Sequence, residues 1–428
     1  MKAKRLKEVI SDDGIRWVNF FNGRLLSGED LSSEQGANRK GLRRLGRAVG
    51  SGVAYGLEVS AAPGVNSLET PLVSVRPGLA VNGEGQTLSL KGEAIVSLTR
   101  PSNAAAEHGL TGDVFDDCTP LQAGTYLASA GIYLLTIAPA RQSEGRAPVS
   151  GLDNITARCN TRYNVEGVQF RLLQIDVSAA VLSDAARLRN RVAYLCFGAG
   201  DAARPSLRSD LFDSPPPAGL LDSLRPCLLT DCDVPLAIIN WTTTGGIVFV
   251  DNWAVRRRIA AHPAEGHAGA LIGDEAKAAA EARFLQFQEQ LEWMGEKEPN
   301  VSAVIASQRF DFLPPAGVLP LAGGAQQAGF MRLKFFEGLT VRAPVFIEGA
   351  RVEQVLRQSL SYAPVSLGTR EMLWLYEVRE NAQDIADRVA LRPARPYMIF
   401  TTGHMPFYGE ARFDLSRWNY SNYSSLFD

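Results

Sequence analysis

The chain has 428 residues, of which 46% are apolar and 21% are charged, and its formal net charge is −2. This length is enough for two or three hydrophobic cores, and the near-neutral charge argues against a protein that binds nucleic acid through a basic surface. No run approaches the ~18 apolar residues of a membrane span, and no apolar stretch follows the basic N-terminus. We therefore expect a protein made in the cytoplasm that neither enters a membrane nor carries a cleaved signal peptide.

The cysteines are odd in number and scattered along the chain, so we expect all of them to be reduced thiols. They are Cys118, Cys159, Cys196, Cys227 and Cys232. The last two are too far apart for a Cys-x-x-Cys pair, and we expect no metal there.

The N-terminal section, residues 1–48, is predicted to contain an aromatic segment followed by a helix. Residues 14–26 alternate apolar and polar side chains around Trp17, Phe20 and Phe21. Ser27 and Asp30 form a plausible capping box, which predicts a helix that ends near residue 47. Its apolar stripe is Leu31, Leu42, Leu45 and Val49, and its other face carries Arg39, Lys40, Arg43, Arg44 and Arg47. This basic face has three possible explanations: a solvated surface, a site for an acidic protein, or a site for nucleic acid or membrane.

Residues 49–260 are predicted to be rich in β-structure, because short apolar runs alternate with turn residues. Asn82-Gly83-Glu84-Gly85 predicts a hairpin between strands at 79–81 and 87–90, with positive φ supplied by Asn-Gly. A short helix is expected at 183–189. Other strands are expected at 53–59, 73–75, 125–127, 132–137, 168–175, 192–197, 236–240 and 247–250.

Residues 261–308 are predicted to be a linker followed by an amphipathic helix, which Asp274 caps and which ends at Gly295. Its apolar positions recur in steps of four and three, as in a heptad pattern. They are Ala280, Phe284, Phe287, Leu291 and Met294. Such a stripe either packs on the chain's own core or joins subunits, and two heptads are too few to hold a coiled coil unaided.

Residues 309–428 are predicted to form a second β-rich section. Strands are expected at 329–335, 344–348, 373–378 and 397–401, with a helix at 351–360. The C-terminal tail has aromatic residues without a helical period, including Trp418 and Tyr420, and we expect it to bind its own chain or a neighbour. The fold class is thus mixed, β-rich and multidomain, with sandwich-like or barrel-like modules.

Motifs of catalysis are missing from the sequence. Gly36 to Gly41 begins like a phosphate-binding loop, but Leu42 occupies the place of the required lysine. His262 and His267 are five residues apart, which does not put them on one helical face. We therefore predict no catalytic, cofactor or metal site, and a protein that is not an enzyme.

Several segments resemble a pattern found in gene clusters of phage tails and contractile injection systems. The most specific is Phe20-Phe-Asn-Gly-Arg-Leu-Leu26, followed by Glu34-Gln35 and by a basic stretch. It is followed by the element Gly52-Val53-Ala-Tyr-Gly56-Leu57-Glu-Val59 and by a Val-x-Pro-Gly-x-Ala element at 75–80. Where the pattern has an aromatic residue or histidine after Glu-Gln, this chain has Gly36-Ala37.

The resemblance implies a structural subunit in or near the baseplate of such a particle, or in an attached cage or fibre. It implies baseplate, sheath or fibre proteins as partners and a homo-oligomer, with a trimer favoured. Partner contacts are then expected from the aromatic segment, the basic helix, the seam around Phe287 and the tail. The alternatives are a carbohydrate- or receptor-binding fibre module, with Trp241, Trp253, Trp374 and Trp418 as sugar-stacking candidates, and a cell-wall hydrolase.

Overall fold

The structure is a computed structural model, and it is mixed and rich in small sheets, most of them antiparallel. It describes residues 14–63, 68–69, 71–99, 126–127, 129–148, 159–198, 219–225, 227–260, 273–322, 329–369, 371–379 and 397–403. The predicted strand at 125–127, the histidines at 262, 267 and 404, and the aromatic tail lie wholly or partly outside these ranges.

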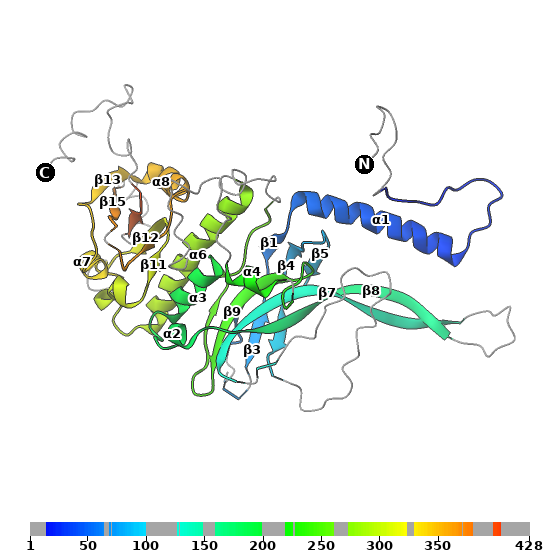
Figure 1. Cartoon of the computed structure of the whole chain (residues 1–428), viewed down its shortest axis with the longest axis horizontal. Coiled ribbons are helices and arrows are strands. Elements are labelled where there is room, and N and C mark those ends of the chain that lie inside the picture. The colour runs from blue at the N-terminus through cyan, green and yellow to red at the C-terminus, as the bar shows by residue number, and fades with distance from the viewer. Residues whose placement is uncertain are drawn as a thin grey trace, which may run out of the picture.

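The chain begins with the predicted helix, α1 (Gly28–Val49), which extends away from the sheets in Figure 1. The capping box is confirmed: Ser27 Oγ accepts from the Asp30 amide, and the Asp30 carboxylate accepts from the Ser27 amide at 3.0 Å. Because both partners lie within four residues of each other, local sequence was sufficient to place this helix start.

Two three-stranded sheets follow, one ordered β1-β4-β5 and the other β2-β3-β6. Their strands are β1 (Gly52–Gly56), β2 (Val59–Ala61), β3 (Leu72–Val75), β4 (Gly78–Val81), β5 (Thr87–Leu90) and β6 (Ala94–Ser97). The strand predicted at 53–59 is thus split in two, at Leu57, which has a φ of 62°. The hairpin after Val81 is confirmed, but its positive φ falls on Gly85 and not on Asn82-Gly83.

A four-stranded antiparallel sheet, ordered β10-β9-β7-β8, forms the centre of the molecule. Its strands are β7 (Gly131–Pro148), β8 (Cys159–Ile175), β9 (Val234–Thr242) and β10 (Gly246–Asp251). Residues 132–138 of β7 are buried on both faces: Tyr133 and Leu135 pack against the three-stranded sheets, while Ile132 and Leu134 pack on the opposite side. This division follows from the alternation of side chains along a strand.

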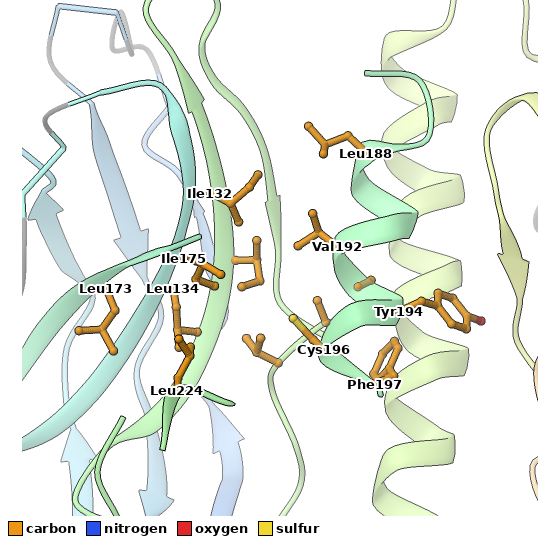
Figure 2. Packing of buried hydrophobic residues seen from close by; sticks show 14 of the residues in the cluster. Ile132, Leu134, Leu173, Ile175, Leu188, Val192, Tyr194, Cys196, Phe197 and Leu224 are labelled. Carbon is orange, nitrogen blue, oxygen red and sulfur yellow. The ribbon is translucent and has the colours of Figure 1, made fainter. Parts of the chain in front are cut away.

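Helices cover that opposite side, as Figure 2 shows: Leu188, Val192 and Cys196 face Ile132 and Leu134 of the sheet. The helices here are α2 (Ala179–Leu182), α3 (Leu188–Cys196) and α4 (Leu220–Leu224). The strand predicted at 192–197 is therefore wrong, and so is the helix predicted at 183–189. From a short apolar run alone, a strand cannot be distinguished from a helix that is buried on nearly all sides. This helix packs on a face of the central sheet.

The long helix α6 (Asp274–Lys297) lies between two cores. Ala282 belongs to the core of α3, whereas Phe287, Leu291 and Met294 belong to the core of the C-terminal sheet. The helix begins at Asp274 as expected, but its N-cap is Gly273, and it continues past Gly295 to Lys297.

The C-terminal sheet is ordered β12-β16-β15-β13, and β13 and β15 are parallel. Its strands are β12 (Ala316–Pro320), β13 (Val345–Glu348), β15 (Trp374–Arg379) and β16 (Tyr397–Thr401), and a small pair, β11 (Phe312–Leu313) with β14 (Val365–Ser366), lies beside it. Helix α8 (Val352–Ser359) confirms the predicted helix. The strand expected at 329–335 is wrong, because residues 332–335 form helix α7 (Arg332–Phe335), whose Phe335 is fully buried.

Candidate subunit interface

The N-terminal segment exposes the three aromatic residues that the sequence selected as anchors. Trp17 is 73% exposed and Phe21 is 63% exposed, and Phe20 is exposed as well. The segment lies along α1, since the Val18 amide donates to the Glu34 carboxylate at 3.2 Å and Arg24 pairs with Asp30 at 2.6 Å. Large aromatic side chains held in solvent by an ordered segment are typical of a surface that a partner covers.

Helix α1 also exposes its apolar stripe. Leu42 is 68% exposed and Leu45 is 63% exposed, and Leu31 and Val49 are exposed too. Ala37 is the only buried residue within the helix. Three glycines inside it, at positions 36, 41 and 46, each weaken a helix by about 1 kcal/mol relative to alanine. A helix with little burial and weak propensity gains most when another molecule packs on it.

The helix is joined to the sheets at its C-terminal end. Gly46 lies against the backbone of Gly85. A side chain on Gly46 would overlap the backbone of Gly85, and a side chain on Gly85 would overlap the backbone of α1. Arg47 forms an ion pair with Glu84 in the same hairpin. This joint directs α1 away from the β1-β4-β5 sheet (Figure 1). The basic side chains at 39, 40 and 44 lie nearer the N-terminal end of the helix than this joint does.

A second projecting element is the hairpin of β7 and β8. Strand β9 pairs with β7 only as far as Ile137, whereas β8 continues to pair with β7 up to Pro148. Beyond Ile137 the hairpin is therefore a two-stranded ribbon, and it extends in the same direction as α1 in Figure 1. Tyr163 and Val165 are exposed on it. Two-stranded ribbons have little stability of their own, so this one also suits contact with a partner.

A buried carboxylate fixes the root of that hairpin. Asp233 accepts from Arg171 at 2.5 Å, from the Thr136 hydroxyl at 3.0 Å and from the Thr230 hydroxyl at 2.7 Å. Its partners come from β7, β8 and the loop before β9. The group therefore ties the strands together just where the ribbon leaves the sheet.

The seam predicted on the second helix is not a free surface. Phe287 and Leu291 are almost fully buried in the chain's own C-terminal core, and Phe284 is half-buried. Phe287 packs edge-on against Phe400 of β16, with ring centroids 5.3 Å apart. Of the two explanations given for this stripe, packing on its own core is the one that accounts for these contacts, and a subunit seam through Phe287 and Leu291 is excluded.

The tryptophans considered for sugar stacking are engaged inside the chain. Trp253 packs beside the α3 core with Arg256 over its ring at 5.2 Å, and Trp374 packs in the C-terminal sheet with Arg342 at 5.7 Å. Trp241 is half-buried at the end of β9. Trp418 and Tyr420 lie outside the described residues.

One buried ionic group joins α3, β10 and α6, and no sequence motif indicated it. Asp251 accepts from Arg189 at 2.8 Å and from Gln286 at 2.9 Å, and Arg189 also contacts Glu289 at 3.4 Å. Burial, and secondarily the charge of Asp251, raises the pKa of Glu289 to about 7. These side chains contact one another where α3, β10 and α6 pack together, so they connect these three elements inside the protein. Among the described residues there is no cluster of three or more potential metal ligands.

The expectation of five reduced cysteines needs correction. Cys232 is disulfide-bonded, whereas Cys196 and Cys227 are free. Burial raises the pKa of the Cys196 thiol to about 12, so that thiol is inert at neutral pH. A disulfide next to the root of the β7–β8 hairpin could not be read from spacing alone, because the pairing depends on distances in the folded chain.

Comparisons with known proteins supply no identity for the chain. No protein-family model matches it, and no curated protein matches it significantly. Within the part of the chain that the structure describes, no helix is both long and apolar enough to cross a bilayer.

Proposed function

We propose that this protein is a structural assembly subunit that acts through contacts with other proteins. The observation that carries the proposal is the pair of projecting elements at the N-terminal end: α1, with its exposed leucines, and the adjoining segment, with Trp17 and Phe21 in solvent. A large apolar surface on an ordered element is unfavourable in water unless a partner covers it in the working state. The β7–β8 ribbon adds a second surface of the same kind.

Within this class, the motif resemblance favours a contractile, phage-tail-like injection particle, with the chain in or attached to the baseplate. Aromatic anchors at the segment and a basic helix beside it fit a docking role, since aromatic side chains dominate binding energies and charges orient the approach. Assembly as a homo-oligomer, with a trimer favoured, is part of the proposal.

Two measurements test it. Light scattering after size exclusion gives the mass of the full chain and of a chain lacking residues 1–48, and the monomer has a mass of 46.4 kDa. Sedimentation from the native host shows whether the tagged chain travels with a sheathed particle. An oligomer, or a chain found in the particle fraction, that depends on residues 1–48 supports the proposal. A monomer at every concentration that also stays out of the particle fraction contradicts it.

A further inference from the structure

Strand β8 is the outermost strand of the central sheet, and its outer edge has neither a bulge nor a proline. The order β10-β9-β7-β8 gives β8 one neighbour, and among the described residues no other strand pairs with it. Its register with β7 is the same from Ile175 to Cys159, and no proline occurs between them. Natural edge strands are commonly protected by bulges or prolines. The edge of β8 is therefore open to a further strand.

The projecting part of β8 has the most to gain from such a strand. Residues 162–167 are all exposed, so both faces of the ribbon are in solvent there. A ribbon of two strands is only marginally stable, whereas a sheet with more strands is stable on its own more readily. One additional strand on β8 would therefore stabilise the ribbon.

The other edge of the ribbon, which belongs to β7, suits pairing less well. Successive backbone N–H groups along a strand point to opposite edges. Pro139 and Pro148 are separated by an odd number of positions, and the register of β7 is unbroken between them. One of the two prolines therefore lies where the outer edge needs an N–H donor, which proline lacks.

The exposed part of β8 is complementary to itself in the reverse direction. When two copies of β8 run antiparallel with Asn164 opposite Asn164, Arg162 of each copy lies opposite Glu166 of the other. In the same register Tyr163 lies opposite Val165. Opposite charges and pairs of an aromatic with a β-branched residue are favourable cross-strand combinations. The two-fold axis makes each of these pairs occur twice.

Neighbouring two-fold registers lack this match. An axis through Tyr163 would place Arg162 opposite Asn164, and an axis through Val165 would place Glu166 opposite Asn164. In the single copy both charged side chains are accessible. The contact of Glu166 with Arg141 is 3.7 Å long and its side chain is 70% exposed, while Arg162 lies over the ring of Tyr163 at 5.1 Å.

The pairing also separates the bodies of the two copies. With Asn164 at the centre, residue 159 of one strand lies opposite residue 169 of the other, so residues 159–169 of both strands are paired. Each ribbon joins its own sheet at Phe170, and the two Phe170 positions are then about 40 Å apart along the strands. The two ribbons together form one sheet, ordered β7-β8-β8-β7.

We propose that a second copy of this chain pairs with the β8 edge, antiparallel and with Asn164 on the two-fold axis. This inference rests on the proposed assembly function and specifies one contact between copies. It is compatible with a trimer, since two-fold and three-fold contacts together give a closed dihedral assembly. The match of Arg162 with Glu166 and of Tyr163 with Val165 selects the register.

Cysteine crosslinking of the full chain tests which edge is used. Directly opposite residues have Cα atoms about 5 Å apart, so Asn164→Cys can form a disulfide with its own copy. The matched control is Ser143→Cys, an exposed position that pairs with Asn164 within the ribbon but lies on β7. The two copies of position 143 would be three strands apart, about 14 Å, which is too far for a disulfide.

Under a mild oxidant we expect Asn164→Cys to give a covalent dimer at least about tenfold faster than Ser143→Cys. The unaltered chain, whose Cys227 is exposed, sets the background rate. The dimer has twice the 46.4 kDa mass of the chain.

Charge reversal tests the register. Arg162→Glu would put glutamate opposite Glu166, and Glu166→Arg would put arginine opposite Arg162. Each variant alone should self-associate at least about tenfold more weakly in analytical ultracentrifugation. When the two variants are mixed, opposite charges face each other at both pairs, so the mixture should form a heterodimer more tightly than either variant forms a homodimer. Glu144→Arg, an exposed charge reversal on β7, should leave association unchanged.

Crosslinking of Asn164→Cys that is no faster than that of Ser143→Cys would overturn the inference, and so would charge variants that do not recover when they are mixed. The second test stays decisive if a cysteine variant misfolds. Either failure leaves the assembly function standing, because that function is tested by whether the chain sediments with a particle.

Discussion

The root of the β7–β8 hairpin provides the sharpest test of the structure, because one buried carboxylate holds three segments there. Asp233 and Arg171 are both almost completely buried, and Asp233 also accepts from the hydroxyls of Thr136 and Thr230. Asp233→Ala would remove the carboxylate that Arg171 contacts in the interior. Breaking a buried pair in this way destabilises a protein by about 3–5 kcal/mol. Among the described residues no third strand pairs with the ribbon beyond Ile137, so the loss should appear there first.

Hydrogen exchange is a suitable assay, since a chain of this size need not unfold in a single step. Amides of β7 and β8 in the ribbon beyond Ile137, near Ala138 and Gln169, should exchange more than about 100-fold faster in Asp233→Ala, the ratio that corresponds to about 3 kcal/mol. Joint replacement of both partners, Arg171→Met with Asp233→Asn, should be less damaging than the sum of the single changes by about 2 kcal/mol.

The same hairpin offers a control. Arg141 and Glu166 are 3.7 Å apart farther along the ribbon, and the Glu166 side chain is mostly exposed. Glu166→Gln should change the opening free energy by less than about 0.5 kcal/mol, as is usual for exposed pairs. If Asp233→Ala changes exchange by less than about fivefold, or no more than Glu166→Gln does, the buried pair does not hold the hairpin.

Three further outcomes are expected. Because the pKa of Glu289 is raised to about 7 from 4.5, the folded state retains a proton in that range which the unfolded state has released. Stability should therefore fall by about 1–3 kcal/mol as pH rises from 4.5 to 7, and Glu289→Gln should flatten the dependence in urea titrations. Under native conditions a thiol reagent should modify the exposed Cys227 at least about 100-fold faster than Cys196, and equal rates would contradict the burial of Cys196. Gly36→Ala and Gly41→Ala have open space around the new methyl group, so each should stabilise α1 by about 1 kcal/mol, seen as slower exchange of its amides; faster exchange would mean that the glycines are contacted.

Local signals in the sequence were reliable where the partners of an interaction are close along the chain. The capping box of Ser27 and Asp30, the hairpin after Val81 and the helix at 352–359 each depend on residues a few positions apart. Strands β9, β10, β13 and β16 were also predicted, since short β-branched runs between turn residues are typical of strands.

Other features could not be predicted, because they depend on what the rest of the chain brings alongside. The run at 192–197 belongs to a helix that packs on a face of the central sheet. Residues 332–335 form a helix whose Phe335 packs in a core made by segments distant in the sequence. The joint of Arg189, Asp251 and Glu289 combines residues from three separated elements. No local pattern marks such a group.

The two helices with an apolar stripe show most clearly which features the local sequence determines and which depend on the tertiary structure. By itself the sequence determined that 28–49 and 274–297 are helices with an apolar stripe, because capping and periodicity are local properties. Only the tertiary structure decided which stripe is available to a partner. Phe287 and Leu291 on α6 are enclosed between two cores, whereas Leu42 and Leu45 on α1 remain in solvent. The physical reason is that the burial of a helix depends on which sheets pack around it, and the residues of the helix alone do not specify those contacts.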